Sequence, residues 1–120
     1  MSMRRLLPIG LALLGAGACG DAKRADREPQ VCRAERVTEC PDPAPVFADV
    51  APIFQEVCSS CHSTPGGPWP LDDYSHIADW QDVIRDDLLT CAMPPPEQDI
   101  TLRDSDRQLI LTWIRCGSRE

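Results

Sequence analysis

The most informative segment of this chain is Cys58-Ser59-Ser60-Cys61-His62. Residues three apart in a helical turn share one face, so the two thiols can reach the same side of one bound group. His62 follows the second cysteine directly and can place an imidazole beside that group. This spacing, Cys-x-x-Cys-His, is the attachment site of a c-type haem, whose iron is bound by the histidine. The motif therefore predicts one covalent haem c, held by Cys58 and Cys61 as thioethers, with His62 as the proximal ligand.

The composition favours a small helical domain built around such a group. The chain has 120 residues, enough for one domain, and only three Trp, one Tyr and two Phe to fill its core. Twelve prolines and little regular alternation argue against a sheet and for short helices joined by fixed loops. The formal net charge is −7, whereas nucleic-acid binding requires a basic stripe. We therefore expect an all-α fold and no nucleic-acid partner.

The amino-terminal residues have the organisation of an export signal. Two arginines precede an apolar run over residues 6–14, and small residues then lead to Cys19. The run is too short to span a bilayer. Small residues directly before a cysteine resemble a bacterial lipobox, which predicts a signal peptide over 1–18 and a lipid on Cys19. Ordinary signal-peptidase cleavage is the alternative, and it would give a soluble periplasmic protein with a free Cys19.

The remaining cysteines are expected to form disulfides. With Cys19 lipidated and two cysteines on haem, four of the seven are left. Disulfides are favoured in an oxidising, extracytoplasmic compartment. Local pairing would give Cys32–Cys40 and Cys91–Cys116, although four cysteines allow three pairings.

Three segments follow one another along the chain. The signal peptide over 1–18 precedes a tether over 19–45, which we expect to be lipidated, stapled by a disulfide and flexible. Its charged run over 21–30 has no apolar periodicity, and such runs are usually solvated. The folded domain is expected over 46–120.

Apolar periodicity predicts three helices in that domain. The first is expected to have Asp49 as its N-cap and to run into Cys58. The second is expected from a cap at Ser75 to about residue 89. The third is expected over 104–116, followed by Gly117 in the position after the helix end that favours glycine.

Met93 is the predicted second ligand of the iron. It lies on a loop, and the three prolines that follow would fix the backbone around its thioether. The alternatives are that Met93 fills core space, as methionines usually do, and that His76 binds the iron instead. With His62 and Met93 both bound, the iron has no open coordination site, so the sequence predicts an electron carrier and not an enzyme.

Two other functions remain open at this point. If Met93 does not bind, a five-coordinate haem would suit a gas sensor or a peroxidase-like domain. If no haem is attached, Cys58, Cys61 and His62 would form a zinc-binding module, with Cys91 as the fourth ligand.

The chain resembles the small mono-haem bacterial cytochromes c of the class I type. In that family a helix leads into Cys-x-x-Cys-His, a loop carries Met-Pro, and a closing helix ends in Trp-Ile-x-x-Gly. The matching segments here are 49–54 with 58–62, then Met93-Pro94, then 113–117. The resemblance implies a small cytochrome c-like fold, with about three helices wrapped around the haem.

The resemblance also implies a set of haem-pocket residues. The first and last helices of the family pack together beside the haem, which implies a contact between Phe54 and Trp113. A proline carbonyl after the motif holds the proximal histidine ring, which implies that Pro68, or alternatively Pro65, contacts His62.

These expectations place the protein outside the cytoplasm. We expect an exported, periplasmic protein that is anchored to a membrane through the lipid on Cys19. Its acidic residues, among them the pairs Asp72-Asp73 and Asp86-Asp87, would steer a redox protein with a basic docking face.

Overall fold

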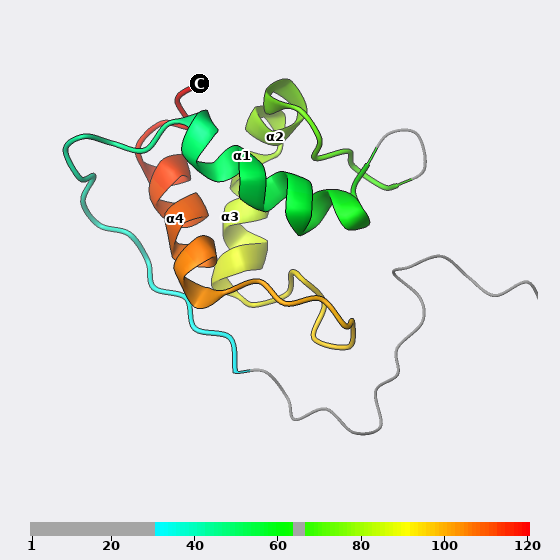
Figure 1. The fold of residues 1–120 in the computed structure, drawn as a ribbon. Helices are drawn as coiled ribbons and strands as arrows, with labels where there is room; N and C mark the ends of the chain where they lie inside the picture. The colour runs from blue at the N-terminus through cyan, green and yellow to red at the C-terminus, as the bar shows by residue number, and fades with distance from the viewer. Residues whose placement is uncertain (1–30, 64–66) are drawn as a thin grey trace, which may run out of the picture.

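Helices make up the regular secondary structure of the described part of the chain. The computed structural model describes residues 31–63 and 67–120, so the predicted signal peptide and the lipidation site at Cys19 lie outside it. The elements are α1 (Phe47–Glu56), the 3-10 turn η1 (Cys58–Ser60), α2 (Tyr74–Asp79), α3 (Gln81–Leu89) and α4 (Asp104–Arg115), shown in Figure 1. The expected all-α class is confirmed for these residues. None of the helices among them is long and apolar enough to cross a membrane.

Apolar faces of α1 and α4 form the centre of the core, and α1 and α3 both pack on α4 (Figure 1). Trp113 and Ile114 lie three and four residues after Ile110, so both fall on the same side of α4 as Ile110, and all three are buried. The Trp113 ring is fully buried, and its centroid lies 6.3 Å from that of Phe54 and 6.0 Å from that of Phe47. The predicted contact between Phe54 and Trp113 is confirmed.

Two helix starts differ from the sequence-based prediction. α1 begins before Asp49, whose carboxylate accepts the backbone N–H of Val46 at 2.9 Å from within the first turn. α2 is capped by Asp73, whose carboxylate accepts the backbone N–H of His76 at 3.0 Å, and not by Ser75. In both cases a short acidic side chain satisfies an amide that the helix leaves without a partner.

The single helix predicted over residues 75–89 is two helices. The backbone breaks at Trp80, which ends α2 and precedes α3. No proline or glycine marks the break in the sequence, and Ile77 and Leu88 are buried on either side of it. Periodicity therefore predicted the buried positions of Ile77 and Leu88, but it placed the exposed Trp80 on the same face and missed the change of direction.

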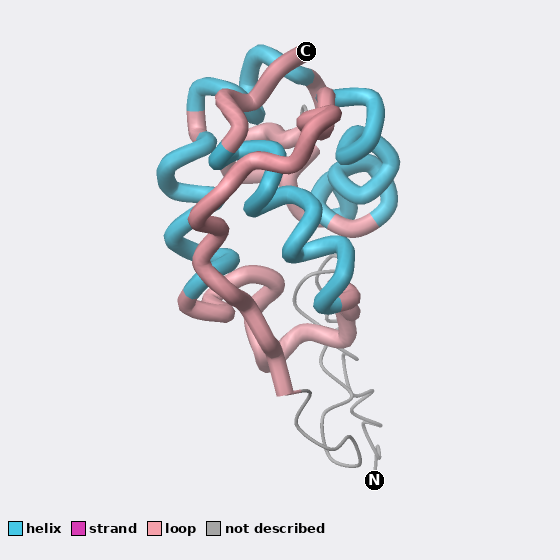
Figure 2. The backbone as a smooth tube through the Cα atoms, turned by 90° about the vertical axis from the view of Figure 1, so that its left-hand side faces the viewer, coloured by secondary structure: helices cyan, strands magenta, loops and turns pink. Residues whose placement is uncertain are grey.

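Residues 32–40, which we call the strap, are attached to α4 and are not part of a flexible tether. The backbone N–H of Arg33 donates to the Asp104 carboxylate at 3.1 Å. The main chain of Glu35 donates to the Gln108 side chain at 3.2 Å and accepts from it at 3.1 Å. The strap runs beside α4 in both views (Figures 1 and 2). The folded domain therefore begins before residue 46, the boundary expected from the sequence.

The strap and α4 run in the same direction and have matching lengths. Residues 33 and 38 of the strap contact residues 104 and 115 of α4. Five extended residues and eleven helical residues both span about 17 Å. An extended segment can therefore follow the whole helix with few residues.

Two disulfides fasten the strap at its ends, joining Cys32 to Cys91 and Cys40 to Cys116. The local pairs predicted from the sequence, Cys32–Cys40 and Cys91–Cys116, are therefore wrong. An extended strap separates its end cysteines by up to about 25 Å, whereas a disulfide needs Cα atoms within about 7 Å. The observed pairs have sequence separations of 59 and 76 residues. Loops of this length make each cross-link worth about 4 kcal/mol in the chain-entropy model.

The carboxyl-terminal residues close the core over the beginning of α1. Gly117 has a φ of +95°, in agreement with its predicted place after α4. The turn returns the chain toward α1, and the Arg119 carbonyl accepts the backbone N–H of Phe47 and the Trp113 ring N–H, each at 2.8 Å. The indole of Trp113 is thus buried with its polar atom satisfied.

Candidate functional site

An open apolar cavity is lined by the four residues that were predicted to attach the haem and bind its iron. Its empty space, with the open mouth included, is about 880 Å³. Cys58, Cys61 and His62 line it from the motif, and Met93 lines it from the loop after α3. The main apolar lining residues are Phe54, Val57, Leu71, Trp80, Ile84, Leu88, Leu102 and Ile110. Asp87 is the one carboxylate that lines it among the described residues.

The motif follows α1 as a tight helical turn. The backbone N–H groups of Cys61 and His62 both donate to the Cys58 carbonyl, at 3.2 and 2.9 Å. This turn places Cys58 and Cys61 three residues apart on one side of the chain, and both reach the cavity.

The His62 ring is held by the residue that the resemblance implied. Its Nδ1 lies 2.6 Å from the carbonyl oxygen of Pro68. A carbonyl only accepts, so Nδ1 carries the proton and donates, and the neutral ring has its lone pair on Nε2. His62 therefore presents Nε2 as the nitrogen that can bind a metal.

The loop that carries Pro68 depends on Gly67. A Cβ built on Gly67 would lie 2.1 Å from the Cys61 carbonyl oxygen, a distance that real Cβ atoms do not adopt. The Gly67 N–H also donates to the Ser63 carbonyl at 2.8 Å, which keeps the loop close to the motif. Only a residue without a side chain permits this approach.

Gly67→Ala is therefore expected to displace Pro68 and to break its hydrogen bond to His62. The expected cost is about 1 to 3 kcal/mol of unfolding free energy, the usual range for overpacking. Urea unfolding measures this cost, and the NMR signal of the His62 Nδ1 proton reports the hydrogen bond. Gly117→Ala is the comparison for the His62 signal, because a Cβ there meets open space and the substitution strains only the backbone at φ +95°, away from the His62 loop. It should leave the His62 signal unchanged, and an unchanged signal in Gly67→Ala as well would contradict the steric argument.

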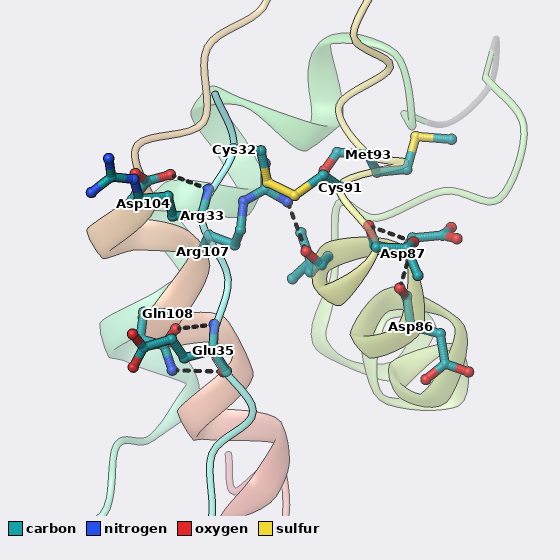
Figure 3. Close-up of a disulfide and its surroundings, with 12 residues drawn as sticks. Cys32, Arg33, Glu35, Asp86, Asp87, Cys91, Met93, Asp104, Arg107 and Gln108 are labelled. Atoms are coloured by element: carbon teal, nitrogen blue, oxygen red, sulfur yellow. Dashed lines mark hydrogen bonds between the residues drawn. A yellow bond between two sulfur atoms is a disulfide. The ribbon is translucent and has the colours of Figure 1, made fainter. Parts of the chain in front are cut away.

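The loop that carries Met93 is held by α3 and by a disulfide. The N–H groups of Ala92 and Met93 both donate to the Asp87 carbonyl, at 2.9 and 3.3 Å. The Cys32–Cys91 disulfide joins the same loop to the strap (Figure 3). The position of Met93 is therefore defined by contacts on both sides of the loop.

Other predicted site residues lie in different places. Phe54 lines the cavity, whereas Trp113 is buried between α1 and α4, outside the cavity lining. Pro68 also lies outside the lining and acts on the site through the His62 ring. His76, the alternative iron ligand, lies outside the lining as well, and its Nδ1 is 3.0 Å from the Asp73 carboxylate.

The cysteines of the site differ in chemical state. Cys58 is a free thiol, and burial raises its pKa to about 11, although the positive charge of Arg107 acts in the opposite direction. Cys61 and Cys91 are disulfide-bonded. Cys91 is therefore not available as the fourth ligand that a zinc site at the motif requires. In the described ranges, the one group of side chains spaced like metal ligands is the exposed trio Asp72, Asp73 and His76.

The raised pKa predicts slow alkylation of Cys58 in the haem-free protein. At pH 8 the thiolate fraction should be about a hundredfold below that of the unfolded chain, because the pKa rises from 9.0 to about 11. The same shift stabilises the folded state below pH 9, and this contribution is lost as the pH rises to about 11. Iodoacetamide labelling, followed by mass spectrometry with and without urea, measures the ratio. Equal rates in both conditions would show that Cys58 is not desolvated.

One residue of the site was missed by the sequence analysis. Arg107 is buried on α4, and its guanidinium contacts the loop that carries Met93. Arg107, Ile110 and Ile114 share the buried face of the helix, so a basic residue at an apolar position was the available signal.

Comparisons of the chain with protein-family models, with curated proteins and with solved structures found no match. The resemblance to the small cytochromes c therefore rests on the motifs and their order along the chain.

Proposed function

We propose that this protein is an electron carrier of the small mono-haem cytochrome c type, with a cytochrome c-like fold and one covalent haem. The observation that carries the proposal is that Cys58, Cys61, His62 and Met93 line a single apolar cavity. The two parts of this set lie on loops separated by α2 and α3. The proposal is supported by the fact that Met93 shares this cavity with both cysteines of the motif and with His62, whose Nδ1 donates to the Pro68 carbonyl and leaves Nε2 for a metal.

Each residue of the set has a defined part in this function. Cys58 and Cys61 would attach the porphyrin, and His62 and Met93 would bind the iron through Nε2 and the thioether sulfur. The bound haem iron supplies one-electron oxidation and reduction. Met93 favours the ferrous state more than a second histidine would. The apolar walls act in the same direction, because the extra charge of the ferric state is costly to bury.

The surface beside the cavity suits a redox partner with a basic face. Trp80 and Val83, which line the cavity, are exposed, and the same helical segment carries the exposed carboxylates of Asp79, Asp82 and Asp86, the last two paired with Arg85. Opposite charges accelerate association in a salt-dependent way. Export and anchoring through a lipid on Cys19 belong to the same proposal, because haem attachment and disulfides both suit an extracytoplasmic compartment.

The visible spectrum of the full chain, produced in a host with haem-c maturation machinery, tests the proposal. Haem-c bands on reduction, with a far-red Met–iron band in the oxidised form, are expected. Haem-c bands without the far-red band would instead favour an open site and thus a sensor or a peroxidase-like domain. Zinc without iron would establish the zinc module. The double variant Cys58→Ala/Cys61→Ala should bind no covalent haem, and a known c-type cytochrome from the same cells shows that maturation works.

The bond formed by the Cys61 sulfur, disulfide or thioether, provides a second, independent test in the same experiment. Its sulfur cannot hold a disulfide and a thioether at once, so attachment requires the reduced form of Cys61. Peptide mapping by mass spectrometry should find haem on the peptide that contains Cys58 and Cys61. The disulfides Cys32–Cys91 and Cys40–Cys116 should remain intact in the same sample.

A further inference from the structure

Among the described residues, Arg107 is the one charged residue that is buried, with an exposed fraction of 4%. One of its terminal nitrogens, Nη1, donates to the Leu88 carbonyl at 3.1 Å and to the Met93 carbonyl at 2.8 Å. Leu88 lies at the end of α3 and Met93 on the loop that follows. Figure 3 shows Arg107, the Cys32–Cys91 disulfide and Met93 close together. One guanidinium thus joins α4, α3 and the Met93 loop.

Burying the Arg107 guanidinium costs free energy that an apolar side chain at this position would not. A buried charge is unfavourable unless it is hydrogen-bonded, and the Nε of Arg107 is buried without a partner. The neighbouring positions on the same face, Ile110 and Ile114, are apolar, and a leucine at 107 would continue that face. The two hydrogen bonds from Nη1 offset part of the free energy lost on burying the guanidinium, since bonds from a charged donor are stronger than neutral ones.

The guanidinium of Arg107 also lies beside the cavity, because Leu88 and Met93, whose carbonyls it contacts, both line it. It lowers the pKa of the Cys58 thiol, against the larger opposite effect of burial. Burial lowers the pKa of Arg107 itself, but a guanidinium remains cationic in proteins. A fixed positive charge near an iron centre disfavours its more positively charged, oxidised state.

We propose that Arg107 is a positioning residue, which holds the Met93 loop so that the thioether stays on the iron and which raises the reduction potential through its charge. The proposal rests on the proposed function. Without the two carbonyl bonds, the loop loses its hydrogen-bonded link to α4, while its bonds to the Asp87 carbonyl and the Cys91 disulfide remain. Met93 would then leave the iron more easily, and an added ligand would replace it.

The test compares Arg107→Met, Arg107→Lys and Arg115→Met in the haem-loaded full chain. Arg115 is exposed on the same helix and serves as the matched control. The readouts are the far-red Met–iron band, the affinity for added imidazole, and the reduction potential. In Arg107→Met the imidazole affinity should rise at least about tenfold, and the potential should fall. Arg107→Lys keeps the charge, but its ammonium ends one bond short of the position of Nη1 and so reaches the two carbonyls less well; it should raise the affinity and change the potential less.

Several outcomes would overturn the proposal. Wild-type imidazole affinity in Arg107→Met would show that the guanidinium does not hold the loop, and an unchanged potential would show that its charge does not act on the iron. Circular dichroism reports whether each variant folds. If Arg107→Met does not fold, Arg107→Lys decides, and wild-type affinity there would count against the positioning role.

A failure of the proposed function is distinguishable from a failure of this inference. If the wild-type protein takes up no haem, the proposed function is wrong, and the role of Arg107 in holding the loop is still measured by amide hydrogen exchange. The N–H groups of Ala92 and Met93, which donate to Asp87, should exchange at least about tenfold faster in Arg107→Met than in Arg115→Met. Equal exchange rates would refute the positioning role itself.

Discussion

Met93→Ala should abolish the far-red Met–iron band of the oxidised protein while the haem remains covalently attached. The thioether is the proposed distal ligand, and Cys58, Cys61 and His62 attach the haem without it. The reduction potential should fall, because the sulfur that favours the ferrous state is lost. Imidazole should bind at least about tenfold more tightly, equivalent to 1.4 kcal/mol, because it no longer competes with a bound side chain.

Met93→Leu is the matched variant for this prediction, because it keeps an apolar side chain of similar size and removes only the sulfur. If Met93 binds the iron, both variants should lose the band. If Met93 only fills space, Met93→Leu should keep the wild-type spectrum, imidazole affinity and potential. His76→Ala should leave all three unchanged, since His76 lies outside the cavity lining. A spectral change in His76→Ala would favour the alternative ligand.

Trp113→Ala is expected to lower the free energy of unfolding by about 3 to 5 kcal/mol. The indole is fully buried, packs edge-on against Phe54, and donates its ring N–H to the Arg119 carbonyl. Its removal leaves a cavity between α1 and α4 and leaves that carbonyl with one bond fewer. For a domain whose total stability is on the order of 5 to 15 kcal/mol, this loss is severe.

Urea unfolding with the disulfides intact measures the effect of Trp113→Ala. Trp80→Ala is the comparison in the haem-free protein, because 39% of its surface is exposed and its ring lies at the edge of the cavity. It should cost less than half as much as Trp113→Ala. Equal losses would show that the α1–α4 contact is not the centre of the core. Trp113→Phe should recover part of the stability, since it keeps an aromatic ring between the two helices.

The parts of the fold that were predictable from sequence are those set by neighbouring residues. The period of the apolar residues identified α4 and the buried face of α1, and Gly117 marked the turn after α4. The break at Trp80 was not predictable in this way, because helices that bend around a core keep the same apolar period on both sides.

In the candidate site, too, the features set by neighbouring residues were predictable, and those set by the packed fold were not. Its chemistry was readable from the motif at 58–62 and from Met93, because the spacing of the cysteines and the histidine is a local property. The role of Arg107 was not read, although a basic residue on the apolar face of α4 was a signal for it. Its two acceptors lie 14 and 19 residues away, and their positions depend on how α3 ends.

Local sequence was enough to predict the helical class, the motif and the residues proposed to bind the iron. The course of the strap along α4, and the pairing of Cys32 with Cys91 and of Cys40 with Cys116, became clear from the packed fold alone. Helical period and motif spacing are properties of a few consecutive residues, whereas a disulfide depends on where two distant segments meet. The strap has no periodic pattern of apolar residues and no sequence motif. It is held by hydrogen bonds from its backbone to side chains of α4. Every residue has such backbone groups, so their partners are determined by the packed fold and not by the local sequence.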